Sequence, residues 1–271
     1  MEQEQRTVDY EKLSNFWNSI PVSSGYAINY LMDHEDLAEY RFQKDCQFVL
    51  DNLPSKQHTF LDLGCGNGNL IATLAPFFEH TDGIDFSARS MSIAQKRFKY
   101  HPTINLRVEN VADAQFDKTY DLVNIAELLM YLADDDILRL LSRISAALTS
   151  AGKVTVRESV ATKKTMHLYN TEHETKRRVL PCLLALFAEA GLYPIKVEHD
   201  YYYNYVWMTH FYFKRTPKLL RHKKFIIFFL NNPVTRFVFL FLPFWLMVWI
   251  RKNSFIHYYF VFAKNKSVPE I

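Results

Sequence analysis

Short apolar segments alternate with longer helical patterns across residues 59–200 of this 271-residue chain. The apolar segments predict strands over residues 59–63, 81–86, 105–108, 120–126, 153–157 and 192–199. The helical patterns predict helices over residues 70–78, 91–100, 136–149 and 181–190. Strands that alternate with helices form a parallel sheet covered on both faces, and ligands of such sheets bind at the carboxyl ends of the strands. The pattern therefore predicts an α/β fold with its site at that edge.

The boundaries of several elements are marked by single residues. Ser87 is a good N-cap for the second core helix, and Gly191 is expected to follow the last one. Residues 150–152, Ser-Ala-Gly, predict a turn before the fifth strand. Before the core, residues 35–50 carry an apolar stripe at helical spacing, formed by Ala38, Phe42, Cys46 and Val49.

Four regions are expected along the chain: a helical arm or lid at 1–54, a core at 55–214, an apolar and basic element at 215–253, and a last strand and tail at 254–271. The aromatic arm, which includes Phe16 and Trp17, either closes over a pocket or packs on the outside of the domain. The last strand is either residues 206–214 or residues 255–264, because both have the bulky composition of strands.

Residues 60–68 read F-L-D-L-G-C-G-N-G and hold three of the chain's seven glycines. Glycine allows a sharp turn and a close approach of the backbone to a ligand. A helix that begins directly after such a loop offers free N–H groups and a positive dipole end. Acidic residues fall at or near the ends of the predicted strands, namely Asp62, Asp85, Asp113, Glu127 and Glu158. This combination predicts a nucleotide-like site rather than an ordinary connection.

The loop departs from the dinucleotide fingerprint G-x-G-x-x-G, because its third glycine comes one residue early and Asn69 takes the expected place. With Asp62 before the glycines, it resembles motif I of the class I S-adenosylmethionine-dependent methyltransferases, and the resemblance extends over roughly residues 55–200. It implies a Rossmann-like seven-stranded sheet with helices on both faces. The helical arm and a C-terminal apolar-basic insertion or appendage are expected in addition.

The resemblance also implies roles for residues at the cofactor, S-adenosyl-L-methionine. Gly64 and Gly66 would approach its methionine part, and Asp62 would hold its amino group. Asp85 would accept hydrogen bonds from the ribose hydroxyls. Residues 112–114, Ala-Asp-Ala, are similar to a G-D-A segment whose acid meets the adenine amino group, although alanine replaces the glycine. The expected cofactor-binding residues are Asp62, Gly64, Cys65, Gly66, Asp85, Phe86, Asp113, Ala114 and Ala126.

Residues 120–132 resemble motif IV of the small-molecule subgroup, which includes quinone, lipid and sugar methyltransferases. Asp121 is interpreted as structural, and the absence of an N-P-P-Y motif disfavours a nucleic-acid acceptor. Methyl transfer depends mainly on positioning, and a base is needed only for a hydroxyl acceptor. Candidates for contact with the acceptor are Glu127, Glu158, His167 and Tyr169, of which none stands out as the base. Arg177 and Arg178 either bind an acceptor phosphate or carboxylate or begin a solvated helix.

The charge of the chain is distributed unevenly. Residues 1–200 hold 28 acidic and 21 basic residues, whereas residues 201–271 hold 11 basic residues and a single acid, Glu270. The longest unbroken apolar run, residues 237–250, is shorter than the roughly 20 residues of a spanning helix. Residues 215–253 are therefore expected to dock on an anionic membrane surface, to cap the pocket, or to form a homodimer face, with a true span as the weakest alternative.

The three cysteines are isolated, which argues for a reducing compartment and against a metal site. The polar N-terminus predicts no secretory signal, so we expect a cytoplasmic protein, peripheral on the inner face of the membrane if residues 215–253 dock there. The sequence thus predicts a methyltransferase that acts on a small-molecule or lipid-linked acceptor. The alternatives are a soluble natural-product or sugar methyltransferase with residues 215–253 as a lid, and an inactive cofactor-binding partner subunit.

Overall fold

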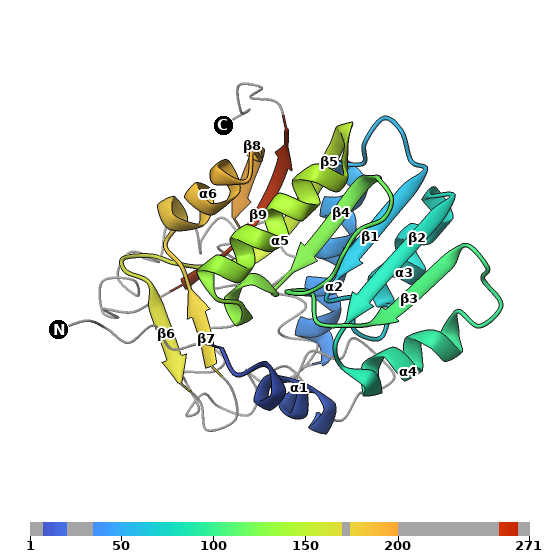
Figure 1. The fold of residues 1–271 in the computed structure, drawn as a ribbon, viewed down its shortest axis with the longest axis horizontal. Helices are drawn as coiled ribbons and strands as arrows, with labels where there is room; N and C mark the ends of the chain where they lie inside the picture. The colour runs from blue at the N-terminus through green and yellow to red at the C-terminus, as the bar shows by residue number, and fades with distance from the viewer. Residues whose placement is uncertain (1–7, 21–34, 170–173, 200–254, 265–271) are drawn as a thin grey trace, which may run out of the picture.

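The structure is a computed structural model and describes residues 8–20, 35–169, 174–199 and 255–264 (Figure 1). The helices in this part of the chain are α1 (Tyr10–Ser19), α2 (Glu35–Asp51), α3 (Asn69–Leu74), α4 (Ala88–Arg97), α5 (Asp134–Ala147) and α6 (Leu180–Glu189), with short 3-10 turns η1 (Ala75–Phe77) and η2 (Leu129–Tyr131). The strands are β1 (Thr59–Leu63), β2 (His80–Asp85), β3 (Ile104–Val108), β4 (Tyr120–Ala126), β5 (Leu148–Ala161), β6 (Met166–Tyr169), β7 (Glu174–Arg177), β8 (Tyr193–His199) and β9 (Phe255–Ala263).

Seven strands form one sheet in the order β3-β2-β1-β4-β5-β9-β8. The first five run parallel, and β9 is antiparallel to both β5 and β8. The predicted seven-stranded α/β sheet is therefore confirmed. Strands β6 and β7 form a separate antiparallel hairpin, which the sequence had not suggested.

Of the two candidates for the last strand, the second is correct, because β9 lies between β5 and β8. Residues 206–214 and 215–253 lie outside the described residues. Strand β8 runs parallel to β5 and ends at His199, while β9 begins at Phe255 beside the end of β5, where it pairs with Ala161. Both ends of the connection formed by residues 200–254 are therefore at the carboxyl edge of the parallel strands.

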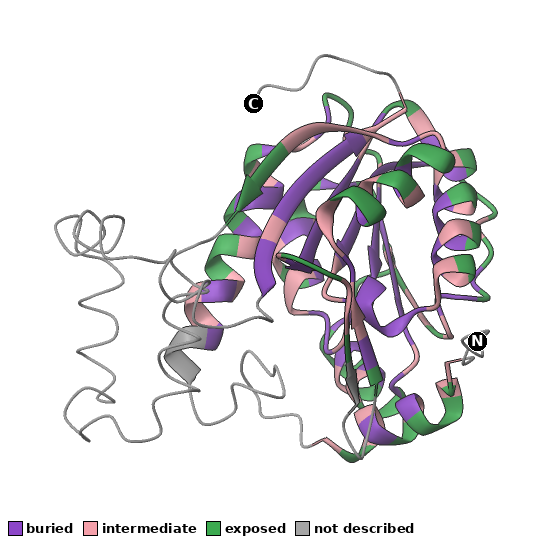
Figure 2. Cartoon of the chain, turned by 90° about the vertical axis from the view of Figure 1, so that its left-hand side faces the viewer, coloured by how far each residue is buried: buried purple, intermediate pink, exposed green. Residues whose placement is uncertain are grey.

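Alternate residues of the central strands face two separate cores. Phe60 and Leu122 pack on one face against helices α2, α3 and α4. Leu61 and Val123 point to the other face, where they pack against α5 and α6. Both faces of the central strands are thus buried, as Figure 2 shows by their purple colour. A strand covered on both faces needs a nearly continuous apolar run, which explains the pattern of β1 and β4.

Two predicted boundary residues act as expected. The Ser87 side chain accepts the Ser90 backbone N–H and caps α4. Gly191 follows α6 with φ +75°, in the left-handed region that favours glycine. Asp121, interpreted as structural, accepts hydrogen bonds from the backbone N–H groups of His58 and Thr59 at 3.0 and 3.3 Å.

The end of the predicted core differs from the sequence expectation in three ways. The expected turn at residues 150–152 is instead an irregularity within β5, where the register with β4 shifts. Strand β5 also continues to Ala161, since β9 supplies an antiparallel partner along its second half. Glu158 therefore lies inside a strand and not in a loop. His167 and Tyr169 belong to β6, and Arg177 ends β7 rather than beginning a helix.

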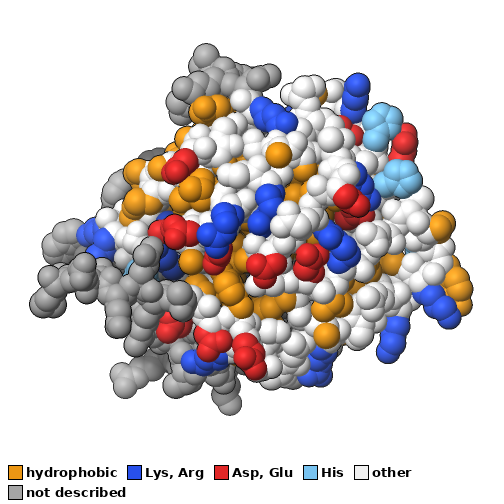
Figure 3. Space-filling view, viewed as in Figure 1, with side chains coloured by type: hydrophobic (Ala, Val, Ile, Leu, Met, Phe, Trp, Pro, Cys, Tyr) orange, Lys and Arg blue, Asp and Glu red, His pale blue; other side chains and the backbone are white. Residues whose placement is uncertain are grey.

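The described surface shows no dominant sign of charge on the face seen in Figure 3, where acidic and basic side chains are interspersed. Within the ranges that the structure describes, no helix has both the length and the apolar character needed to span a bilayer. The same residues hold no group of three or more His, Cys, Asp or Glu side chains arranged for a metal ion.

Candidate functional site

The loop after β1 is held in a shape that requires glycine. Gly64, Gly66 and Gly68 have φ values of +74°, +55° and +76°, all in the left-handed region. The N–H groups of Gly64 and Cys65 both donate to the carbonyl of Ile84, at 2.8 and 3.1 Å. The loop is thereby fixed against the end of β2, next to Asp85.

The three loop glycines face different surroundings. A Cβ at Gly68 would lie 2.6 Å from the Phe98 ring, and one at Gly64 would lie 3.4 Å from Leu128. A Cβ at Gly66 would meet no atom of the described residues within 4 Å. Gly68 is thus required by packing, whereas the backbone at Gly66 borders open space that a ligand can approach.

Asp85 lies at the end of β2 and is tied to the loop. Its two carboxylate oxygens accept the backbone N–H groups of Gly66 at 2.9 Å and Ser87 at 2.8 Å. Burial raises the pKa of Asp85, and these two hydrogen bonds counteract part of that rise. Each carboxylate oxygen has two acceptor sites, so the group retains capacity for the hydroxyls of a ligand.

Asp62 is buried on the neighbouring strand and accepts a hydrogen bond of 2.8 Å from the Asn124 side chain. Burial, together with the negative charge of Asp85, raises the pKa of Asp62 to about 7. The groups that act on this pKa, Asn124, Asp85 and Asp45, include no cation in the described part of the chain. An ammonium group at this position would stabilise the ionised carboxylate.

The segment after β3 forms its turn without the glycine of the resembled family. Asn110 organises it, since its side-chain oxygen accepts the Ala112 N–H at 3.1 Å and its carbonyl accepts the Asp113 N–H at 3.0 Å. Arg143 also donates to the Ala112 carbonyl at 2.6 Å. Asp113 is exposed and Ala114 is buried. An alanine at position 112 is therefore compatible with this backbone.

Three further predicted cofactor residues have packing contacts. Cys65 is buried with its sulfur 3.6 Å from that of Met91, and burial raises the pKa of its thiol well above the usual range. Phe86 is half-buried and packs with Leu13 and Met130. Ala126 ends β4 and is also half-buried. The structure brings these residues together at the carboxyl edge with Asp62, Gly64, Gly66 and Asp85.

Helix α1 lies over this edge (Figure 1). The Asn18 side-chain oxygen accepts hydrogen bonds from the Ser87 hydroxyl at 3.3 Å and the Arg89 N–H at 3.2 Å. The ring of Trp17 meets that of Tyr131 edge-on at 5.6 Å. The described part of the arm therefore contacts the segments that follow β2 and β4. No pattern in the sequence marked Asn18, because a single polar residue in a helix has no distinctive signature.

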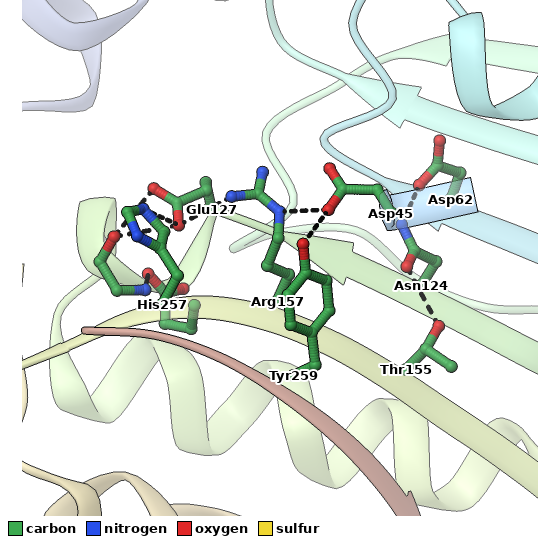
Figure 4. A network of polar contacts seen from close by, with 10 residues as sticks. Asp45, Asp62, Asn124, Glu127, Thr155, Arg157, His257 and Tyr259 are labelled. Carbon is green, nitrogen blue, oxygen red and sulfur yellow. Dashed lines mark hydrogen bonds and ion pairs between the residues drawn. The ribbon is translucent and has the colours of Figure 1, made fainter. Parts of the chain in front are cut away.

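Glu127 follows β4 and lies in a buried polar network (Figure 4). Its φ is +53°, the one positive value of a non-glycine residue among those described. Its carboxylate accepts the Ser159 hydroxyl at 3.0 Å, pairs with Arg157 at 3.0 Å and lies 3.5 Å from His257 Nε2. Arg157 also pairs with Asp45 at 2.9 Å.

The electrostatics of the network make Glu127 and His257 weak bases. Burial favours the neutral form of Glu127, but the positive charges of Arg157 and other neighbours outweigh it and hold the pKa below its usual range. Burial lowers the pKa of His257 to about 4, so this ring is neutral at pH 7. The sequence did not indicate His257, because it is the single histidine within an aromatic strand whose pairing was ambiguous.

The other predicted acceptor residues lie on β5 and β6. Glu158 points to the opposite face of the sheet from Arg157, and its carboxylate accepts the Leu129 N–H at 2.9 Å. Burial and the negative charge of Glu127 raise the pKa of Glu158. Glu158 is thus close enough to Glu127 for their charges to interact, and it directly follows Arg157 in β5. His167 is exposed on β6, and the side chain of Tyr169 lies outside the described residues.

Arg177, which ends β7, and Arg178, which follows it, have different environments. Arg178 is buried, donates to the carbonyls of Leu129 and Leu132 at 2.9 and 2.7 Å, and pairs with Asp134. It therefore holds η2 in place. Its N–H groups are already used within the protein, so it neither faces solvent nor has donors left for an acceptor. Arg177 instead places its guanidinium 4.3 Å from the ring centre of Phe255.

Comparisons with known proteins agree with this arrangement. Residues 60–152 match the family model of a methyltransferase domain. Nodulation protein S of Sinorhizobium fredii is 32% identical over 74 residues, which are 27% of this chain and 34% of that protein. Malonyl-[acyl-carrier protein] O-methyltransferase 1 of Ilyobacter polytropus is 28% identical over 101 residues, or 36% of this chain and 37% of that protein. The matches thus span about a third of the length of these curated relatives.

A solved structure covers nearly the whole chain. Geranyl diphosphate C-methyltransferase from Streptomyces coelicolor, in complex with Mg²⁺, geranyl diphosphate and S-adenosyl-L-homocysteine, superposes with a TM-score of 0.62. The match covers 94% of this chain and 98% of that chain at 16% identity. At this level of identity the likeness concerns the fold.

Proposed function

We propose that this chain, a member of the class I S-adenosylmethionine-dependent methyltransferases, transfers a methyl group from S-adenosyl-L-methionine to a small-molecule or lipid-linked acceptor. The observation that carries the proposal is the junction of Gly66 and Asp85. The Gly66 backbone borders open space, and its N–H fixes the carboxylate of Asp85 beside that space. A glycine loop that borders open space beside an anchored carboxylate suits the ribose and methionine parts of this cofactor.

The remaining predicted residues fit the same cofactor. Asp62 offers a buried carboxylate without a cationic neighbour in the described structure, which suits the amino group. Asp113 is exposed after β3, where it is accessible to an adenine amino group. When bound, the cofactor supplies an electrophilic methyl group. The chain's own task is then to hold the acceptor in line and to exclude water.

The residues at the carboxyl edge favour catalysis by positioning. Glu127 has a lowered pKa and His257 is neutral with a pKa of about 4, so neither is a strong base at neutral pH. Helix α1 covers part of the edge through Asn18 and Trp17. We infer that the rate depends on alignment of the acceptor in a dry site rather than on a dedicated general base.

Binding of S-adenosylmethionine to the purified protein tests the assignment. Isothermal titration of wild type, Asp85→Ala and Asp117→Ala is expected to show a loss of about tenfold or more in affinity for Asp85→Ala alone. Asp117 is the matched control, because it is exposed and precedes β4 at the opposite edge of the sheet. An unchanged affinity in Asp85→Ala would contradict the cofactor assignment. Methyl transfer by the protein alone would separate an enzyme from an inactive partner subunit.

We also propose that residues 215–253 bring the enzyme to an anionic membrane surface on the cytoplasmic side. The proposal is supported by the excess of basic and aromatic residues there and by the attachment of residues 200–254 at the carboxyl edge. Each basic residue near such a surface contributes about 1 kcal/mol. The acceptor would then be reached from the lipid phase.

Flotation with phosphatidylserine vesicles tests this docking. We expect a smaller floated fraction when glutamine replaces Lys218, Arg221, Lys223 and Lys224. The reduction should be larger at low ionic strength, where salt screens the attraction less. A control with glutamine at Lys96, Arg97 and Lys99 removes charge from α4 and the residues after it. Equal flotation of the two variants would contradict docking and favour residues 215–253 as a pocket cap or dimer face.

A further inference from the structure

The network around Glu127 contains more cations than anions. Arg41, Arg157 and Arg177 all act on the pKa of Glu127, whereas among the described residues Asp45 is the other carboxylate that pairs with Arg157. These five side chains carry a net positive charge when all are ionised. Buried or partly buried charges are costly unless they are paired.

Arg41 on α2 is an incompletely satisfied member of the network. It is 7% exposed, and its Nε has no hydrogen-bond partner among the described residues. Its charge acts on Glu127, Asp45 and His257, which places its guanidinium beside the network. Arg41 lies one helical turn before Asp45, nearer to the carboxyl edge, because α2 ends close to the beginning of β1.

Arg177 approaches the same place from β7. Its guanidinium stacks on Phe255 at 4.3 Å, and its Nη1 donates to the Thr175 hydroxyl at 3.4 Å. Its Nε is buried and, like that of Arg41, lacks a hydrogen-bond partner in the described ranges. Stacking on an aromatic ring orients the planar fork of an arginine while its N–H groups stay available.

The position of the network connects it to the proposed methyl-transfer site. Glu127 directly follows Ala126, and the next residue, Leu128, would contact a Cβ at Gly64 of the loop at 3.4 Å. The three arginines therefore all act on a residue that directly follows the end of β4, next to the predicted cofactor contact Ala126. In sheets of this kind the acceptor enters at this edge.

We propose that Arg41 and Arg177 bind an anionic oxygen group, a carboxylate or a phosphate, of the methyl acceptor. The inference rests on the proposed function, whose acceptor class it narrows. Two guanidinium groups with free donors match the paired oxygens of such a group and form charge-assisted hydrogen bonds with it. Arg157 is not assigned to the anion site, since it is already ion-paired with Asp45 and Glu127.

The test uses the full-length protein saturated with S-adenosyl-L-homocysteine, titrated with inorganic phosphate and separately with acetate. Wild type is expected to bind at least one of the two anions. Arg41→Met and Arg177→Met are each expected to weaken that binding by about tenfold or more. Arg41→Lys, which keeps the charge and loses the fork, is expected to be intermediate. Arg139→Met is the matched control, because Arg139 is exposed on α5.

The outcomes separate this inference from the function on which it rests. If wild type binds S-adenosyl-L-homocysteine but neither phosphate nor acetate, the anion site is overturned. The methyltransferase assignment then stays intact. Equal anion binding in wild type and all arginine variants also overturns it. Anion binding that depends on Arg41 or Arg177 while the cofactor does not bind supports the anion site and contradicts the proposed function. Thermal unfolding of each variant shows whether it is folded, and Arg41→Lys serves if Arg41→Met is not.

Discussion

The side-chain amide of Asn124 donates a 2.8 Å hydrogen bond to the carboxylate of Asp62. Thr155 fixes the orientation of this amide, because its hydroxyl donates to the Asn124 oxygen at 3.0 Å and leaves the NH₂ group to face Asp62 (Figure 4). A neutral amide stabilises the carboxylate less than a cation would. Burial therefore dominates, and the pKa of Asp62 rises to about 7.

The affinity for S-adenosylmethionine is expected to depend on pH through Asp62. If its carboxylate holds the cofactor ammonium, binding lowers the pKa of Asp62 from about 7, and a proton is released. Affinity should then fall by up to about tenfold for each pH unit below 7 and level off above it. Titrations at pH 5.5–8 in buffers of different ionisation enthalpy measure both effects. An affinity independent of pH over this range would contradict the assigned contact.

The stability of the ligand-free protein should respond to the same group. The folded-state pKa of Asp62, about 7, lies above its usual value of 3.8, so the folded protein binds the extra proton and loses stability as pH rises between these values. Asp62→Asn removes this titration and keeps an acceptor for Asn124. From pH 5 to pH 8, the unfolding free energy of the variant should gain about 2–3 kcal/mol relative to wild type. Urea unfolding at both pH values measures the difference, with Asp117→Ala at an exposed position as the control.

Two glycine substitutions in the loop should separate ligand approach from packing. Gly66→Ala puts a methyl group into open space and should cost about 1–2 kcal/mol in backbone strain, while cofactor affinity falls by tenfold or more. Gly68→Ala meets the Phe98 ring at 2.6 Å and should be the more destabilising of the two. Thermal unfolding and isothermal titration of both variants test this. The opposite order of stability would mean that the loop is packed differently.

The sequence predicts the cofactor half of the site well because its signals are local. Asp62 and the glycines form one contiguous segment, and Asp85 falls at the end of a strand recognisable from its own composition. Such residues take their positions from the strand that carries them. Parallel neighbours β1 and β2 then bring Asp62 and Asp85 to one edge, as their paired registers show.

The acceptor half was not predictable in the same way, since its contacts join distant segments. Arg157 meets Asp45 of α2, and Glu127 meets His257 of β9. No local pattern identifies such partners, and the choice of β9 itself required its pairing with β5. Glu158 was expected in a loop because polar residues 157–159 look like the end of a strand. They continue the strand instead, since each is satisfied by a buried polar partner.

His257 should make the protein sensitive to mild acid. Its folded-state pKa of about 4 lies below the 6.5 of an ordinary histidine, so the unfolded chain binds a proton that the folded chain does not. The contribution of His257 to stability should therefore fall as pH decreases from about 6.5, by about 2 kcal/mol between pH 7 and pH 5. His257→Gln is expected to remove this part of the pH dependence, whatever its effect on stability at pH 7.

The comparison with His80→Gln shows whether the effect belongs to the buried ring. His80 is exposed at the start of β2, so its replacement removes a histidine without touching the buried network. Urea unfolding of wild type and the two variants at pH 5, 6 and 7 gives the slope of unfolding free energy against pH. This pH range lies above the one in which Glu127 titrates. Equal slopes for wild type and His257→Gln would mean that the ring is solvated or that it is charged beside Glu127. A charged ring would add a fourth cation to Arg41, Arg157 and Arg177, and the preference of Arg41 and Arg177 for an anion would be stronger still.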